Sequence, residues 1–334
     1  MLTRLAVAAV SLVLAAPTLV EAQQDRSKII LGYARCAQCF SMALMPELTD
    51  KLAIETVGFN TASDVLTALV SKSIDVAQVT YLHFITALDK GFDVVAISGH
   101  VNGGSEILAQ PKLALAANDW TGFKKLVADR KAQRTPLKVA ASRGSAQDIH
   151  MRGELKLNGV DVGRDVEFIN IPNPADHAAA LQRGEADVIC TVEPFASQIR
   201  LAGTGSAFAQ PYRQAAGKLT SLIVTRSDVI DRRPADVQET VNAVVKLVDK
   251  LNGDPQASVD IIVRHTGLDR TIAQAALNNL FPDYKMYRGS TFAIGRMMSD
   301  LRYVSHDVSA DIDRRMNYRF LVEAANRPRA DLGY

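Results

Sequence analysis

Three cysteines and six histidines are the side chains of this 334-residue chain with the most reactive chemistry. Two cysteines form a Cys-x-x-Cys motif, Cys36 to Cys39, whereas Cys190 stands alone. In an oxidising compartment such a pair usually forms a disulfide, and in a reducing one it more often binds metal or carries out redox chemistry. We therefore expect a Cys36–Cys39 disulfide if the chain is exported, with Cys190 as a small buried thiol. A metal or persulfide site built from all three cysteines is the alternative.

The histidines and the acidic residues predict no catalytic centre. The six histidines never occur as HxH or HxxxH, so the sequence indicates no metal site. No GxSxG, P-loop or GxGxxG motif occurs either. His83 follows Thr80 at the start of a predicted helix, and we interpret it as a residue of the helix surface or of the core. We expect no catalytic residue, no bound metal and no cofactor.

Polar residues suited to ligand binding occur where a predicted strand gives way to a helix. Ser142-Arg143-Gly144-Ser145 follows a short apolar run, and Ser145 with Asp148 resembles a capping box. A helix start presents free backbone N–H groups and the positive end of the helix dipole. Gly144 lets a ligand approach the backbone closely. We therefore expect this segment to bind an anionic or hydrogen-bond-accepting group.

A similar arrangement is predicted in the first half of the chain. Thr80 and Tyr81 open a helix after the apolar run 76–79, and Gly103 belongs to a flexible loop at the end of a later strand. Each feature alone is equally compatible with plain capping or turn chemistry. Their shared position at the carboxyl ends of predicted strands is what favours a binding site.

Charged and aromatic residues complete the expected site. Arg35 and Arg143 lie in loops beside helix starts, so we expect the ligand to carry an acceptor or anionic group. Glu193 is expected to accept a hydrogen bond from the ligand's other end, which would suit a zwitterion or an amide-bearing heterocycle. Phe40 and Tyr81 are candidates for aromatic surface. The predicted ligand-binding residues are Arg35, Phe40, Thr80, Tyr81, Gly103, Ser142, Gly144, Ser145, Asn170 and Glu193.

The elements that carry these residues alternate strand and helix through residues 137–192 and again through 28–99. Helical connections between short strands predict parallel pairing in α/β lobes. We expect two lobes, each a mostly parallel sheet with helices on both faces, and a cleft between them at the strands' carboxyl ends. The predicted first lobe comprises residues 28–110 and 219–334, and the predicted second lobe comprises residues 111–218.

The order of these pieces resembles the solute-binding proteins of ABC importers, in the branch that binds nitrate, taurine, alkanesulfonates and thiamine-precursor pyrimidines. The resemblance implies the type II periplasmic-binding-protein fold and an ABC permease of the inner membrane as partner. Val192 stands where this family often has an aromatic residue before Glu193-Pro194, so no ring-stacking wall is expected there. The matching segments are residues 69–77, 87–91, 94–99, 144–145, 157–160, 165–169, 178–188 and 193–195. A looser match comprises residues 223–226 and 233–234 with a predicted long helix after them, and together the segments cover most of the mature chain.

The first 22 residues have the pattern of a cleaved signal peptide. A short basic start precedes the apolar residues 5–16, and Val20-Glu21-Ala22 fits an A-x-A-like cleavage site. The apolar run is shorter than the roughly 20 residues that a membrane span needs. We expect cleavage after Ala22 and a periplasmic mature protein. The net charge of +2 gives no reason to expect nucleic acid as a partner.

The sequence therefore predicts a monomeric, extracytoplasmic solute-binding protein that captures a small polar or anionic organic molecule and delivers it to an ABC permease. The alternative is an enzyme on the same fold, similar to the pyrimidine synthase of thiamine biosynthesis, that uses the Cys36–Cys39 loop. Cys39-Phe40 matches only a fragment of that enzyme's cysteine-rich motif, and the export signal disagrees with it. A third hypothesis is a sensor subunit that presents its ligand to a membrane kinase. Sulfonate, carboxylate, pyrimidine and nitrate ligands all stay open.

Overall fold

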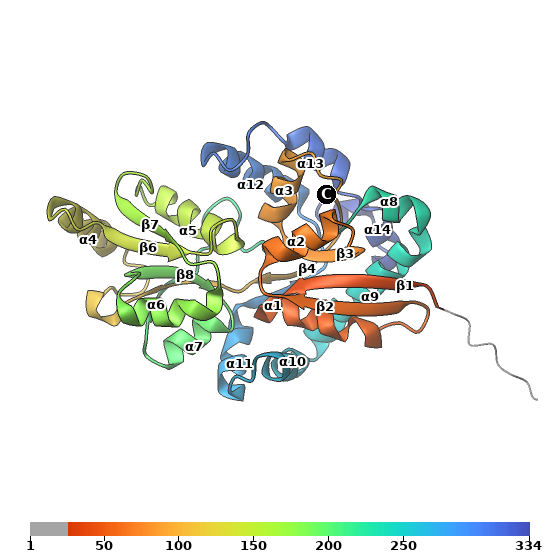
Figure 1. The fold of residues 1–334 in the computed structure, drawn as a ribbon, viewed down its shortest axis with the longest axis horizontal. Helices are drawn as coiled ribbons and strands as arrows, with labels where there is room; N and C mark the ends of the chain where they lie inside the picture. Colours follow the sequence, from red (N-terminus) through yellow and green to blue (C-terminus); the bar gives the residue numbers. More distant parts are fainter. Residues whose placement is uncertain (1–25) are drawn as a thin grey trace, which may run out of the picture.

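The computed structural model of the chain describes residues 26–334, which form two α/β lobes lying side by side (Figure 1). Each lobe is a sheet with helices on both faces, as the alternation of apolar strands with helices predicts. The predicted signal peptide, residues 1–22, and its cleavage site lie outside the described residues. In the described part, none of the helices combines the length and the hydrophobicity of a bilayer span.

The first lobe is built on a six-stranded sheet with the strand order β11-β4-β10-β3-β1-β2. β1 pairs in parallel with β2 and β3, whereas β10 runs antiparallel to both β3 and β4. β11 pairs antiparallel with β4 and was not predicted from the sequence. The strands are β1 (Lys28–Ala34), β2 (Ala53–Phe59), β3 (Val76–Thr80), β4 (Val95–Gly103), β10 (Ser221–Thr225) and β11 (Leu280–Asp283).

The second lobe is built on a five-stranded sheet with the order β7-β6-β8-β5-β9. β6 pairs in parallel with β7 and β8, and β5 runs antiparallel to β8 and β9. The strands are β5 (Ser105–Ala109), β6 (Leu137–Ala141), β7 (Val166–Asn170), β8 (Val188–Val192) and β9 (Ser206–Ala209).

Both sheets are mixed rather than mostly parallel, which corrects the expectation from the sequence. β5 is the strand by which the chain enters the second lobe, and β10 is the strand by which it returns to the first. Neither is reached through the helical crossover that gives parallel pairing, and each runs against both of its neighbours. Except for the pair of β11 with β4, the antiparallel pairs are therefore a consequence of the two crossings between lobes.

The first crossing between the lobes lies before β5, several residues earlier than the boundary expected between residues 110 and 111. Residues up to 110 were assigned to the first lobe, but Ser105–Ala109 pairs within the second sheet. Gly103 and Gly104 make the crossing, with φ angles of 85° and 82°, a region that glycine occupies without strain. The Gly103 amide donates to the Lys218 carbonyl at 2.8 Å, so the outgoing and returning segments are bonded to each other.

Three helices begin at the cavity described below, and capping explains each start. Thr61 caps α2 (Ala62–Val70), Thr80 caps α3 (Tyr81–Asp89), and Ser145 caps α5 (Ala146–Leu157) through side-chain oxygens that accept a backbone N–H. The predicted helix starts at Thr80 and Ser145 are thus confirmed. In contrast, the expected loop at residues 35–40 contains a short helix, α1 (Ala37–Phe40), followed by the 3₁₀ turn Ser41–Glu47.

The other helices form the outer layers of the two lobes (Figure 1). α4 and α5 cover one face of the second sheet, and α6 and α7 cover the other. Long α9 packs against the first sheet on the face opposite α2 and α3. These outer helices are α4 (Trp120–Ala132), α6 (His177–Arg183), α7 (Phe195–Leu201), α8 (Ser227–Arg232), α9 (Pro234–Gly253), α10 (Gln256–Thr266), α11 (Arg270–Ala276), α12 (Arg288–Asp300), α13 (Ser309–Arg315) and α14 (Arg319–Ala325).

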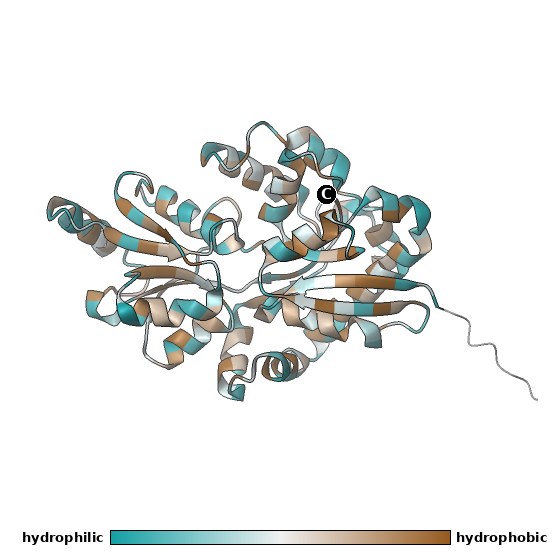
Figure 2. Ribbon diagram, in the orientation of Figure 1, coloured by the Kyte–Doolittle hydropathy of each residue, from teal (hydrophilic) through white to brown (hydrophobic). Residues whose placement is uncertain are grey.

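Each lobe has its own hydrophobic core. Figure 2 shows the apolar residues concentrated in the strands and the polar residues on the outer helix surfaces. In the second lobe, Trp120, Phe123 and Phe208 form an aromatic cluster under α4, and Leu181 and Ile199 pack on the opposite face of the sheet. The two cores are largely separate, and Ile149 of α5 is the residue of the second lobe that packs into the core of the first.

Candidate functional site

A cavity of about 230 Å³ lies between the two lobes. The first lobe contributes residues in or just after the last part of β1, β2 and β3, together with Ser221 at the start of β10. The second lobe contributes residues that follow β6 and β7, together with Val192 at the end of β8. Parallel strands end at the same edge of their sheet, so the polar residues after each strand are brought together there. The cavity therefore lies in the interlobe position predicted from the sequence.

Five of the predicted ligand-binding residues line this cavity. Arg35 and Thr80 reach it from the first lobe, and Ser142, Gly144 and Ser145 reach it from the second. The residues from the first lobe precede those from the second by more than 60 positions in the sequence, so only the pairing of the lobes brings the two sets together. That they bind a ligand stays a prediction.

Phe40 and Tyr81 do not line the cavity. Phe40 is 2% exposed and stacks on His265 with ring centroids 5.5 Å apart. Tyr81 is 1% exposed within the core of the first lobe. Both rings turn inward because their apolar surface is buried with other side chains of that core. As a result, no phenyl or phenol ring of the described residues faces the cavity.

Gly103, Asn170 and Glu193 also lie outside the cavity lining, and each holds a neighbouring segment in place. Gly103 forms the crossing, where a Cβ would lie 2.4 Å from the Asn279 carbonyl oxygen. Asn170 Oδ1 accepts the Arg143 amide at 2.8 Å and so fixes the loop before α5. These residues can affect a ligand only by positioning the residues that line the cavity.

Glu193 is a buried carboxyl group at the end of β8. It is 1% exposed, and its Oε2 accepts the Ser197 amide at 3.0 Å, which turns the carboxyl away from the cavity. Burial raises its pKa to about 7. Its backbone joins the lobes: the amide donates to Gly104 at 2.7 Å, and the carbonyl accepts the Ala37 amide at 2.9 Å. The geometry thus disagrees with the expectation that Glu193 contacts a ligand.

The backbone N–H groups expected to be free at Ser142-Arg143-Gly144-Ser145 already have acceptors. The Gly144 amide donates to Asp148 Oδ2 at 2.8 Å, and the Ser145 amide donates to the Ser142 carbonyl at 3.1 Å. Asp148 thus reaches back to the loop as the acidic member of a capping box does. The next two amides, of Ala146 and Gln147, have no acceptor among the described residues. Any amide donor for an anion at this helix start comes from those two.

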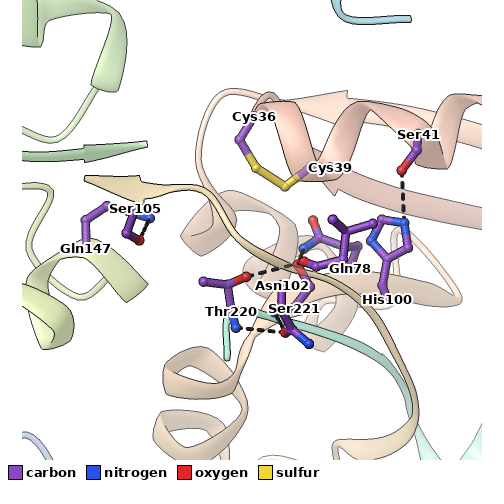
Figure 3. Close-up of a disulfide and its surroundings, with 11 residues drawn as sticks. Cys36, Cys39, Ser41, Gln78, His100, Asn102, Ser105, Gln147, Thr220 and Ser221 are labelled. Atoms are coloured by element: carbon purple, nitrogen blue, oxygen red, sulfur yellow. Dashed lines mark hydrogen bonds between the residues drawn. A yellow bond between two sulfur atoms is a disulfide. The ribbon is translucent and has the colours of Figure 1, made fainter. Parts of the chain in front are cut away.

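Three glutamines in the cavity wall were missed by the sequence analysis. Gln38, Gln78 and Gln147 are 5%, 2% and 6% exposed. Gln78 Nε2 donates to Ser221 and Gln147 Nε2 donates to Ser105, each at 2.9 Å (Figure 3). The sequence contained a signal for one of them. Gln78 lies among apolar residues in the strand Val76–Thr80, and a buried amide requires hydrogen-bond partners, which indicates a polar site at that place.

His83 links two hydroxyl groups at the cavity. Its Nδ1 lies 2.7 Å from Thr80 Oγ1, and its Nε2 lies 3.1 Å from Ser63 Oγ. Burial lowers the pKa of His83 to about 4, so the ring is neutral at pH 7, with one nitrogen donating and the other accepting. In either tautomer, the hydroxyl that accepts from the ring keeps its own proton. One of the two hydroxyls is therefore always available to donate to a ligand.

The charges at the cavity are of one sign. Arg35 and Arg143 are exposed side chains on its wall, and no carboxylate is among the described residues that line it. The N-caps Thr61, Thr80 and Ser145 place the positive ends of three helix dipoles at the same space. This field favours an anion or a strong hydrogen-bond acceptor.

Cys36 and Cys39 lie in the cavity wall with their Cα atoms 5.0 Å apart and their sulfur atoms joined (Figure 3). Cys190 is fully buried in the core of the second lobe, and burial raises the pKa of its thiol. The three cysteines therefore do not form one site. Nor does any cluster of three or more potential metal ligands occur within residues 26–334. The oxidation state of the Cys36–Cys39 pair stays a prediction.

Known structures share this fold at low sequence identity. The nitrate-binding protein NrtA from Synechocystis PCC 6803 is 17% identical with a TM-score of 0.76, over 90% of this chain and 89% of that chain. A ligand-binding component of an ABC-type import system from Staphylococcus aureus, with zinc bound, is 19% identical with a TM-score of 0.73, over 91% and 100%. The aliphatic sulphonate-binding protein SsuA from Escherichia coli is 18% identical with a TM-score of 0.70, over 87% and 92%.

These likenesses establish the two-lobed fold of the periplasmic binding proteins for this chain. No curated protein sequence matches the chain at a significant level. Residues 3–264, well over half of the sequence, match the NMT1-like family. The chain is therefore a member of the NMT1-like family.

Proposed function

We propose that the protein is a solute-binding protein that captures a small anion between its lobes and delivers it to an ABC permease. The observation that carries this proposal is one cavity lined from both lobes by helix-capping hydroxyls and two arginines. A ligand that touches both lobes favours the closed state over the open one, which a permease can recognise. Three structural relatives support the same reading: one is named as the ligand-binding component of an ABC-type import system, and the other two as periplasmic sulphonate- and nitrate-binding proteins.

The lining narrows the class of ligand. The absence of a carboxylate among the described lining residues leaves an ammonium group without a partner, so a zwitterion is disfavoured. Apart from the His83 imidazole, no aromatic ring of the described residues lines the cavity, so a heterocycle finds no phenyl, phenol or indole ring to stack on. A volume of about 230 Å³ suits a small sulfonate, carboxylate or inorganic anion. The proposed ligand class therefore differs from the zwitterion or amide-bearing heterocycle that Glu193 suggested in the sequence.

The proposed setting is the periplasm, with the mature chain acting as a monomer. The signal-peptide pattern that ends at Ala22 supports export. N-terminal sequencing of exported protein should begin at Gln23, and a retained N-terminus would contradict this localisation.

A thermal-unfolding screen of nitrate, methanesulfonate, taurine, acetate and a pyrimidine tests the ligand class. An anion at 100 times its Kd adds roughly 2.7 kcal/mol to the free energy of unfolding. We expect stabilisation by a monovalent anion and none by the pyrimidine, and calorimetry should then give one site per chain. Stabilisation by the pyrimidine alone, or a bound anion that survives Arg35→Gln/Arg143→Gln unchanged, would overturn the proposal.

One observation favours the enzyme alternative: Cys36 and Cys39 line the same cavity. Incubating the purified protein with its anion and analysing the supernatant by mass spectrometry separates the two functions. A binding protein returns the anion unchanged, whereas an enzyme returns a product or keeps a covalent adduct on a cysteine.

A further inference from the structure

Cys36 and Cys39 differ in how well a small molecule can reach them. Both line the cavity, but Cys36 is partly exposed, whereas Cys39 is 2% exposed. Arg35, directly before Cys36, places an exposed guanidinium at the same cavity. A nearby positive charge stabilises a thiolate and attracts an anionic thiol. Cys36 is therefore the sulfur that an incoming thiol can attack.

The two residues between the cysteines contact the second lobe and the crossing. The Ala37 amide donates to the Glu193 carbonyl, at the end of β8, at 2.9 Å. The Gln38 side chain packs on the crossing residue Gly104, where a Cβ would lie 2.7 Å from Gln38 Oε1. Gly104 in turn accepts the Glu193 amide at 2.7 Å. The Cys36–Cys39 link thus closes a short loop whose inner residues join the first lobe to the second.

We propose that Cys36 and Cys39 form a thiol–disulfide exchange site, and that its redox state sets how firmly the lobes are joined at Ala37 and Glu193. The co-reactant is a small anionic thiol, with glutathione as the example that suits Arg35. A glutathione thiolate attacks Cys36 Sγ, the Cys36–Cys39 bond breaks, and Cys39 leaves as a thiolate that takes up a proton. A second glutathione thiolate attacks the glutathione sulfur of the mixed disulfide and releases Cys36. The protein gains two electrons and two protons, and the two thiols leave as glutathione disulfide.

This inference goes beyond anion binding and couples to it. Because the pair forms part of the cavity wall, an anion that contacts the wall binds the oxidised and reduced forms with different affinities. By reciprocity, the anion shifts the redox equilibrium by the same factor. The exchange chemistry itself requires no ligand, so its tests stand even if the proposed ligand class is wrong.

Equilibration of the mature chain in glutathione redox buffers tests the exchange under native conditions. After acid quenching, thiols are counted by maleimide labelling in denaturant. We expect one reversible transition in which two thiols appear together, with Cys190 labelled throughout. Cys190→Ala should show the same transition with one thiol fewer. A pair that is reduced only after the protein is unfolded contradicts the proposal.

Single-cysteine variants identify which of the two sulfur atoms exchanges with glutathione. With glutathione disulfide, Cys39→Ser should acquire glutathione on Cys36 about tenfold or more faster than Cys36→Ser acquires it on Cys39, because only Cys36 is partly exposed and adjacent to Arg35. Equal rates would show that the cavity does not direct the exchange.

Amide hydrogen exchange tests the effect on the lobes without any ligand. Reduction should speed exchange at the Ala37 and Glu193 amides by about tenfold, because local opening becomes less costly there. The amides of β6 should be unchanged. Cys36→Ser/Cys39→Ser should show the fast exchange in oxidising buffer as well. Unchanged protection at Ala37 and Glu193 would overturn the claim that the pair acts on the lobes.

Discussion

In the cavity, the position of one proton on His83 decides whether the Thr80 or the Ser63 hydroxyl can donate to a ligand. Because His83 exchanges its donor and acceptor nitrogens with tautomer, each hydroxyl can replace the other as ligand donor. We therefore expect Ser63→Ala or Thr80→Val alone to weaken anion binding by less than about tenfold, within the range of one lost hydrogen bond. The double variant should lose more than the two single losses combined.

Calorimetry on the unaltered protein, the two single variants and the double variant gives the coupling free energy between Ser63 and Thr80 in anion binding. Thr80→Val also removes the cap of α3, worth about 1 kcal/mol, so the free energy of unfolding is measured beside binding. Ser73→Ala removes an exposed hydroxyl outside the cavity and should bind as the unaltered protein does. Additive losses would show that His83 does not connect the two groups.

Glu193 should make stability fall as the pH rises. Burial raises its folded pKa to about 7 from the ordinary glutamate value of 4.5, so between these values the folded state holds a proton that the unfolded state has released. The free energy of unfolding therefore decreases from pH 5 to pH 8 on this account. Glu193→Gln removes the effect and should gain about 2 kcal/mol relative to the unaltered protein over that interval.

Denaturant unfolding of both proteins at pH 5 and pH 8 measures this gain. The buried histidines, such as His100 with a pKa of about 3, act in the opposite direction, but equally in both proteins. The exposed Glu185→Gln serves as a control and should show no such gain. A difference between the two proteins that does not change with pH would show that Glu193 is ionised throughout.

At the scale of residues, the sequence revealed side chains that act through local motifs. Thr80 and Ser145 were predictable because a cap is defined by the few residues around it. Gln38, Gln78 and Gln147 were not, because each becomes part of the cavity only through packing between distant segments. Glu193 shows the converse, since a matching Glu-Pro pair does not reveal which way the carboxyl points.

At the scale of elements, local pattern predicted the strands but not all of their partners. The helical connections correctly indicated the parallel pairs of β1 with β2 and of β6 with β7. The pairing of β5 with β8 joins residues such as Ser105 and Val192 that lie far apart in the sequence, so the sequence near Ser105 could not show which sheet it joins. The first crossing was therefore placed several residues too late.

The crossing at Gly104 should tolerate no side chain. Its φ of 82° is unfavourable for other residues, and a Cβ would lie 2.7 Å from Gln38 Oε1. Gly104→Ala should therefore lower the free energy of unfolding by about 1–3 kcal/mol. Gly289→Ala is the matched control, because it lies near the start of α12 with no atom within 4 Å of the added Cβ. Its stability should be unchanged or higher, and equal losses in the two variants would contradict this view of the crossing.

At the scale of the whole molecule, the two lobes meet at few polar contacts away from the crossing. Asp148 in α5 accepts hydrogen bonds from Tyr303 of the first lobe and from the Gly144 amide beside the cavity. Lys156 and Asp300 form a second interlobe pair, but both are exposed and contribute little. Asp148 thus connects the position of the lobes to the loop that lines the cavity.

Tyr303→Phe should shift the molecule toward an open state. Tyr303 does not line the cavity of about 230 Å³, but it lines an adjoining hollow together with Ser63, His83 and Gly144. The variant loses the hydrogen bond to the buried Asp148 carboxylate, while Arg152 still pairs with that carboxylate at 2.7 Å. Since binding requires closure, a smaller closed fraction raises the apparent Kd by the same factor, and one lost hydrogen bond to a charged group gives roughly tenfold. Small-angle scattering of the ligand-free variant should show a larger radius of gyration. Tyr334→Phe, at an exposed residue of the first lobe, should change neither quantity. A weaker Kd with an unchanged radius would place the effect in the Gly144 loop instead, and no change in either would show that Asp148 and Tyr303 do not hold the lobes together.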